Sequence, residues 1–214
     1  MRLDLYLVYT NVTSSRTRAA NLIKLNKITV NGKTANKAAL DIKATDIVKI
    51  ISDYPVSLGG IKLLEAFEKW DISVKDKVCL DVGASNGGFT DVLLKKDASL
   101  VYALDVGECA LPTYLQDNEK VVVMDKTNAR FITKDNFEKP IEAAFIDVSF
   151  ISLELILPTV YSIIEDKGKI VALIKPQFEL TRKDLTKSGI VKSKKLQEQV
   201  IKKITSLAIS LGSI

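Results

Sequence analysis

The sequence contains no histidine, and this absence is the first limit on its chemistry. Catalytic triads and metal sites that depend on an imidazole are excluded, so proton transfer must use lysine, carboxylate, tyrosine or cysteine. The two cysteines, Cys79 and Cys109, have unrelated spacing and indicate neither a disulfide framework nor a metal site. We therefore expect a reducing compartment, a cytoplasmic location and no bound metal.

Long apolar runs are also missing. No segment approaches the ~20 apolar residues of a transmembrane helix. The N-terminal stretch "MRLDLYLVYTNV" carries Arg2 and Asp4, whereas a secretory signal needs an uninterrupted apolar core. With 214 residues, of which 47% are hydrophobic and 27% charged, the chain has a globular composition and suits one large domain or two small ones.

Positive charge is concentrated near the N-terminus. Residues 1–50 hold nine Lys or Arg and three acidic residues, a net charge of +6, while the remainder holds 22 basic and 23 acidic residues. A basic module is thus attached to a nearly neutral body. Such a module is either a solvated charged face or a surface for a polyanion such as nucleic acid.

The basic module has a recognisable order of elements. "MRLDLYLVYTN" and "SSRTRAANLIKLNK" predict two amphipathic helices, "ITVNGKTA" predicts a hairpin with an Asn-Gly turn, and "TDIVKI" predicts a further strand. Through "SR…A…LI…..ITVNGK" this module resembles S4-type RNA-binding domains, which are small α+β units. The resemblance implies that a basic face meets phosphates of structured RNA through Arg2, Arg16, Arg18 and Lys24.

The rest of the chain alternates strands with helical patterns. Strands are predicted at residues 78–82, 100–105, 121–124, 143–147 and 169–174. This alternation predicts an α/β domain, a parallel sheet with helices on both faces, which binds ligands at the carboxyl ends of its strands. We expect domains at 1–51 and 61–214, joined by a Pro- and Gly-containing linker at 52–60.

The stretch "CLDVGASNGGFTDVLL" predicts a strand, a glycine turn and a helix, which is the layout of a nucleotide or nucleoside site. A dinucleotide site expects G-x-G-x-x-G, but Ser85 stands at the second glycine position. Asp81 would repel a pyrophosphate and suits a ligand with a cationic amino-acid part, such as S-adenosylmethionine (SAM). The alternative is a plain strand–helix turn. The predicted SAM contacts are Asp81, Gly83, Ser85, Gly87, Gly88, Asp105 and Asp125.

Several blocks taken in order carry a more specific resemblance. They are "SLGGIKL", "LDVGASNGGFTDVLL", "MDKTNAR", "FIDVSFISLELILP" and "LIKPQFE", and they follow the S4-like start. Together they resemble the TlyA family, bacterial ribosomal-RNA 2′-O-methyltransferases that are also called haemolysins. The resemblance covers essentially the whole chain. It implies a Rossmann-like FtsJ-type domain that uses SAM to methylate cytidine ribose in ribosomal RNA.

The resemblance also implies the catalytic residues. FtsJ-like enzymes use a Lys-Asp-Lys-Glu set, whose first three members correspond to Lys62, Asp147 and Lys175. Lys175 would act as base, Asp147 would orient it, and Lys62 would stabilise negative charge on the oxygen. The plain alternatives are a solvated lysine, a helix cap and a strand-end lysine, respectively. We expect the sheet edge that carries the glutamate to be missing from this chain, and Glu179 is not assigned to that role.

Three other functions stay open at this point. Because the fourth catalytic residue, the glutamate, is not assigned, a non-catalytic RNA-binding or ribosome-assembly function remains an alternative. A pore-forming haemolysin is disfavoured, because the sequence has neither a membrane span nor a strongly amphipathic cationic helix. A nicotinamide enzyme is disfavoured by Ser85 and Asp81.

Overall fold

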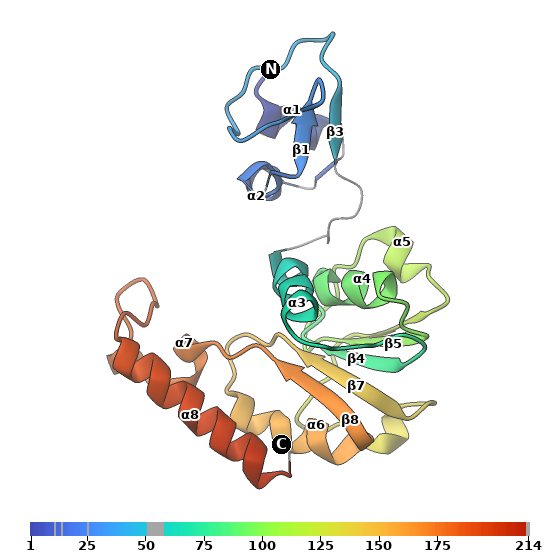
Figure 1. The fold of residues 1–214 in the computed structure, drawn as a ribbon, viewed down its shortest axis with the longest axis vertical. Helices are drawn as coiled ribbons and strands as arrows, with labels where there is room; N and C mark the ends of the chain where they lie inside the picture. The colour runs from blue at the N-terminus through green and yellow to red at the C-terminus, as the bar shows by residue number, and fades with distance from the viewer. Residues whose placement is uncertain (11, 14, 25, 51–57, 213–214) are drawn as a thin grey trace.

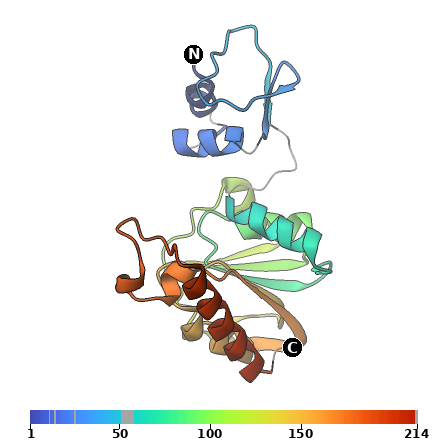
Figure 2. The same cartoon turned by 60° about the vertical axis from the view of Figure 1, so that its left-hand side comes forward.

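The structure, a computed structural model, describes residues 1–10, 12–13, 15–24, 26–50 and 58–212. It has a small N-terminal unit and a larger α/β body (Figure 1, Figure 2). Residues 52–57 of the predicted linker (52–60) lie outside the described residues. The last three residues of that range are helical, because α3 begins at Leu58. The domain boundaries themselves stay a prediction.

The N-terminal unit packs two helices on a three-stranded antiparallel sheet of order β2-β1-β3. Asn31 and Gly32 both have positive φ and form the hairpin turn, as the sequence predicts. The core of the unit joins both helices to β1 through Leu3, Leu7 and Ile23, which are at most 1% exposed. The elements are α1 (Leu3–Tyr9), α2 (Arg16–Lys24), β1 (Ile28–Val30), β2 (Lys33–Thr34) and β3 (Val48–Ile50).

The body is built on a five-stranded parallel sheet of order β6-β5-β4-β7-β8. The strands are β4 (Val78–Val82), β5 (Leu100–Leu104), β6 (Val121–Met124), β7 (Ile141–Ile146) and β8 (Ile164–Ala172). The predicted parallel α/β sheet is therefore confirmed. β8 begins five residues before the predicted strand and ends two residues before its predicted end. Its first half, "IEDKG", is charged and contains Gly168, so its sequence is typical of a loop although Ile164 pairs with Ile141 of β7.

Helices cover both faces of this sheet (Figure 1). On one face, Leu63 of α3 and Val92 of α4 pack against Phe145 of β7. On the other face, Val160 of α6 and Ile204 of α8 pack against apolar residues of β4 and β7. The helices are α3 (Leu58–Lys69), α4 (Gly88–Lys95), α5 (Thr113–Gln116), α6 (Leu157–Ile163), α7 (Pro176–Glu179) and α8 (Lys194–Ser210), with 3₁₀ turns η1 (Lys134–Asn136), η2 (Leu153–Leu155) and η3 (Arg182–Asp184).

The order of strands determines where a ligand can bind. The chain runs outward from β4 to β5 and β6, then returns to the other side of β4 for β7 and β8. Loops that leave β4 and β7 therefore diverge to opposite faces at the carboxyl edge, which is the topological switch point of the sheet. Most residues of the predicted body site follow β4, β5, β6, β7 or β8 at this edge, whereas Asp81 lies within β4 and Lys62 lies on α3.

The packing between α3 and β7 predicts a large loss of stability on truncation of Phe145. Its side chain is fully buried, and its ring lies 5.9 Å from the ring of Phe67 in α3. Phe145→Ala should lower the free energy of unfolding by about 3–5 kcal/mol in urea denaturation. Phe131→Ala, which removes a ring that is 70% exposed, should change it by less than about 0.5 kcal/mol. Equal effects of the two substitutions would contradict this packing.

Candidate active site

The turn between β4 and α4 requires glycine at two positions. Gly83 and Gly87 have φ values of +89° and +78°. A Cβ atom on Gly83 would lie 2.8 Å from the carbonyl oxygen of Asp147, and one on Gly87 would lie 2.7 Å from a methyl group of Leu115. The turn thus lies against the loop after β7. Ser85, between these glycines, adopts a φ of +50°, which is uncommon for a residue with a side chain.

Asp105, directly after β5, connects two loops of the predicted cofactor site. Its Oδ2 accepts a hydrogen bond from the Ser85 N–H at 3.0 Å, and its Oδ1 accepts one from the Gly107 N–H at 2.9 Å. The side chain is half-buried. Because each carboxylate oxygen can accept more than one hydrogen bond, Asp105 retains capacity for the hydroxyls of a ribose.

Asp125, directly after β6, is exposed and closes the loop that follows β5. Its Oδ1 accepts a hydrogen bond from the Cys109 N–H at 2.5 Å, and this backbone donor holds the pKa of Asp125 below its usual range. Burial raises the pKa of the Cys109 thiol, which is therefore a poor nucleophile. The exposed carboxylate of Asp125 can accept further hydrogen bonds beside the one from the Cys109 N–H.

Asp81 lies beneath the turn rather than on its surface. The residue is 0% exposed, and its Oδ2 accepts hydrogen bonds from the Thr90 N–H at 2.9 Å and the Thr90 hydroxyl at 2.6 Å. Its Oδ1 is buried and has no hydrogen-bond partner among the described residues. Burial raises the pKa of Asp81 to about 7, and the nearby carboxylates of Asp147 and Asp105 add to this effect. Asp81 thus anchors α4 and places an acceptor under the glycine turn.

Asp147 and Lys175 meet at the same edge, although 28 residues separate them. The Nζ atom of Lys175 lies 2.5 Å from Oδ1 of Asp147, and both side chains are about one-sixth exposed. This contact is an ion pair without normal hydrogen-bond angles, since Oδ1 has no hydrogen-bond partner within the described residues. Nζ also donates to the Ser149 hydroxyl at 3.0 Å. Two acceptors therefore fix the direction of this ammonium group.

Lys62 does not join this pair. It is exposed on α3, and no hydrogen bond or ion pair connects it to Asp147 or Lys175 in the described part of the chain. Glu179 has a different partner, because it accepts hydrogen bonds from the Ser152 hydroxyl at 2.5 Å and the Leu153 N–H at 2.8 Å. Glu179 thus fastens α7 to η2.

Phe150 is a feature of this edge that the sequence analysis did not single out. The residue is 91% exposed and has a φ of +63°, a conformation that is costly for an aromatic residue. Its ring lies 5.1 Å from the ring of Phe178, which in turn lies 5.8 Å from Nζ of Lys175. An aromatic surface therefore borders the Asp147–Lys175 pair. Only the fold reveals it, because in the sequence Phe150 is one more apolar residue.

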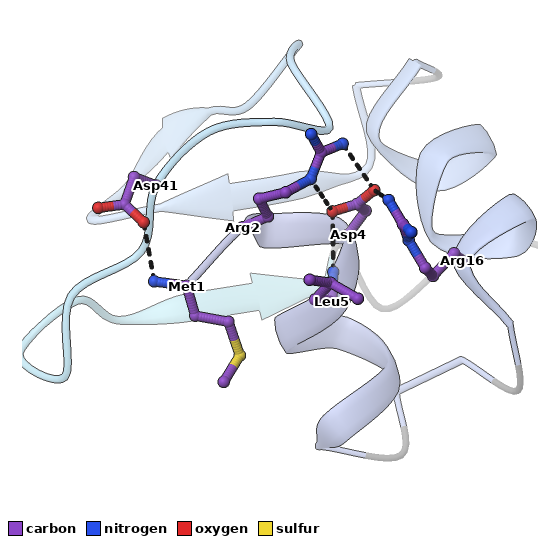
Figure 3. Close-up of polar contacts among 6 residues, drawn as sticks. All are labelled: Met1, Arg2, Asp4, Leu5, Arg16 and Asp41. Atoms are coloured by element: carbon purple, nitrogen blue, oxygen red, sulfur yellow. Dashed lines mark hydrogen bonds and ion pairs between the residues drawn. The ribbon is translucent and has the colours of Figure 1, made fainter.

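The predicted RNA face of the N-terminal unit is organised around Asp4 (Figure 3). Arg2 donates to Asp4 from Nε and Nη2, each at 2.9 Å, and Arg16 donates from Nη2 at 2.9 Å. The two guanidinium groups hold the pKa of Asp4 well below its usual range. Lys24 is exposed at the end of α2, and Arg18 lies within α2, with its side chain outside the described part.

Both parts of the chain match known protein families. Residues 55–212 match the FtsJ-like methyltransferase family, and residues 1–48 match the S4 domain. Fold and family together define a Rossmann-like methyltransferase preceded by an S4 domain. The chain belongs to the FtsJ-like methyltransferase family and, within it, to the group of TlyA proteins.

Individual relatives support this assignment. The chain is 41% identical to Hemolysin A of Brachyspira hyodysenteriae, across 99% of this chain and 89% of that protein. It is 36% identical to the 16S/23S rRNA (cytidine-2′-O)-methyltransferase TlyA of Mycobacterium tuberculosis, across 99% and 80%. A solved structure from Streptococcus thermophilus, named as a candidate hemolysin, superposes with a TM-score of 0.73 at 36% identity and covers 99% of this chain and 78% of that chain.

None of the helices within the described residues has the length and apolar character needed to cross a membrane. The same residues contain no group of three or more Cys, Asp or Glu side chains arranged to hold a metal ion.

The buried Asp81 predicts a specific dependence of stability on pH. Its pKa is about 7 in the folded protein and near 3.8 when the chain is unfolded, so the folded state binds the proton more tightly. Stability should therefore fall as the pH rises from about 4 to about 7, by on the order of a few kcal/mol, and Asp81→Asn should remove this slope. Denaturant unfolding at a series of pH values measures the difference between the two proteins.

Asp125→Asn is the control of opposite sign. Because the pKa of Asp125 is lowered by folding, its contribution to stability is present at neutral pH and is lost as the pH falls. Parallel stability curves of Asp81→Asn and the parent protein between pH 4 and 7 would show that the pKa of Asp81 is not raised by folding.

Proposed function

We propose that the protein is a SAM-dependent methyltransferase that modifies the ribose 2′-hydroxyl of a cytidine in ribosomal RNA. The observation that carries this proposal is the Asp147–Lys175 ion pair, which lies at the sheet edge beside the glycine turn of an FtsJ-like domain. The proposed target follows the relatives, since the Mycobacterium tuberculosis protein is named for cytidine-2′-O methylation of 16S and 23S rRNA.

The residues of the turn suit SAM. The backbone of Gly83, Ser85, Gly87 and Gly88 would hold the amino-acid part, while Asp105 and Asp125 would accept hydrogen bonds from the nucleoside. Asp81 adds a buried oxygen, without a hydrogen-bond partner among the described residues, beneath the turn. This acid suits SAM, which carries a positive sulfonium and a positive amino group, and it disfavours the negative pyrophosphate of a dinucleotide. SAM would supply an electrophilic methyl group carried on a sulfonium.

The close approach of Gly83 to the backbone of Asp147 brings the cofactor turn next to the catalytic pair. A 2′-hydroxyl is a weak nucleophile, so its proton must leave as the oxygen forms its new bond. Lys175 accepts this proton at Nζ, and Asp147 and Ser149 fix the direction of Nζ. In the resting ion pair Nζ is an ammonium without a lone pair, so Lys175 must first lose one of its three Nζ protons to solvent, to which it is partly exposed.

RNA is the substrate class that best suits the surroundings of this pair. Nucleobases stack on exposed aromatic rings, and the exposed ring of Phe150 offers such a surface next to Phe178, the ring that borders Lys175. Lys62, exposed on α3, would stabilise negative charge on the reacting oxygen or hold a neighbouring phosphate once RNA is bound. The basic S4 unit would supply the remaining affinity through phosphate contacts, which position an RNA without reading its sequence.

The proposed role of Lys175 predicts a loss of turnover without a loss of fold. Lys175→Ala should lower the rate of methyl transfer to ribosomal RNA by about 10²–10⁴-fold or more, because it removes the proton acceptor. SAM binding should persist, since Lys175 lies outside the glycine turn. The measurement is transfer of a labelled methyl group from SAM to purified ribosomal subunits.

Lys167→Ala is the matched control, because Lys167 is an exposed lysine in the first half of β8, away from the carboxyl end that Lys175 follows. It should leave the rate unchanged. Near-normal turnover in Lys175→Ala would reduce Lys175 to a surface lysine and would favour a non-catalytic RNA-binding protein.

The proposed cofactor site predicts selective binding of SAM. Calorimetry should detect SAM and not NAD, and Asp105→Asn should weaken SAM binding by about tenfold or more, because both the ligand contact and the Ser85 tether lose a charged acceptor. Asp117→Asn, at the end of α5, should have no effect. Tight binding of NAD without binding of SAM would overturn the cofactor assignment.

A further inference from the structure

One buried carboxylate connects two exposed arginines in the N-terminal unit (Figure 3). The Asp4 side chain is 5% exposed, whereas those of Arg2 and Arg16 are 47% and 57% exposed. Arg2 precedes α1 and Arg16 opens α2, so a single acid joins the starts of two helices. The carboxylate also accepts a hydrogen bond from the Leu5 N–H at 3.0 Å.

The charges of this triad do not balance. Two guanidinium groups and one carboxylate leave a net charge of +1, and neither arginine forms an ion pair with a second acid among the described residues. Arg2 uses Nε and Nη2 for Asp4, and Arg16 uses only Nη2. An arginine has five N–H donors, so donors remain on the exposed side of both groups.

We propose that Asp4 is a positioning residue that holds Arg2 and Arg16 as a two-armed clamp for one RNA phosphate. The inference depends on the proposed function, since it gives the RNA-binding surface a specific anchoring point. A phosphodiester carries one negative charge, which neutralises the triad, and its oxygens accept from two guanidinium groups at once. Because Asp4 already orders both arginines, binding avoids much of the entropy loss of immobilising two long side chains.

A purely structural role for Asp4 predicts a different result. Burying an acid between arginines can hold a fold together, although such ion pairs often contribute little net stability. If Asp4 does only this, then a folded Asp4→Asn protein, which is more positive by one charge, should bind RNA as tightly as the parent or more tightly. The clamp predicts the opposite sign, because the arginines lose their fixed orientation.

The experiment measures binding of the full chain to purified ribosomal RNA by fluorescence anisotropy at several salt concentrations. Asp4→Asn should weaken binding by about tenfold. Asp41→Asn removes an exposed acid of the same unit, paired with the N-terminal ammonium, and should leave binding unchanged or slightly tighter. In the Arg2→Ala/Arg16→Ala background, Asp4→Asn should no longer weaken binding, because Asp4 acts through those arginines.

The outcomes separate this inference from the proposed function. If Asp4→Asn binds as tightly as the parent while Arg2→Ala/Arg16→Ala binds weakly, the clamp is wrong and the RNA surface stands. If the arginine double variant binds normally with an unchanged salt slope, both the clamp and the RNA role of this face fail. Methyl transfer by the parent protein tests the enzyme independently of either result.

A second measurement covers the case in which Asp4→Asn does not fold. In the unsubstituted protein, ¹⁵N relaxation of the Arg2 and Arg16 Nε–H groups reports their mobility before RNA is added. Rigid groups that change little on binding support the clamp, and groups that become rigid only with RNA overturn it. Arg16→Lys keeps the charge but cannot present the same planar donors, so it should bind RNA more weakly than Lys24→Arg does.

Discussion

The functional edge of this protein depends on one close contact between two backbones. Gly83, after β4, lies so near the carbonyl group of Asp147, after β7, that no side chain fits between them. This contact brings the glycine turn and the Asp147–Lys175 pair together, although they belong to neighbouring strands from separate parts of the chain. In the proposed reaction, the cofactor held by one loop and the proton acceptor held by the other would share one small region, which in-line transfer requires.

The parallel sheet was predictable because several of its strands are apolar runs with an acid at or next to the carboxyl end. Val78–Val82 and Val121–Met124 were predicted with their observed bounds. The first half of β8 was not predictable, because its charged residues are tolerated only at the edge of the described sheet, next to β7. Hydrophobic periodicity reports burial, and the first half of β8 has only one large apolar residue, Ile164, so it shows no strand pattern.

The candidate site was predicted more completely as a set of residues than as an arrangement. The sequence indicated that Asp147 and Lys175 follow neighbouring strands, and the structure brings their side chains into contact. It did not indicate that Asp81 lies beneath the turn with its carboxylate bound to Thr90, because burial of an acid depends on the packing of α4. Arg2 and Arg16 were predicted as surface charge, but both are hydrogen-bonded to Asp4. A count of charges only lowers the net charge by one for Asp4 and does not reveal this contact.

The strained backbone of Phe150 has a consequence for how this protein can evolve. A residue with positive φ and an exposed ring lowers stability twice, through its conformation and through apolar surface left in water. Selection for thermal stability alone would replace it with glycine or asparagine, either of which adopts this conformation more readily. A chain that keeps phenylalanine there carries this cost, and favourable interactions elsewhere in the fold must offset it.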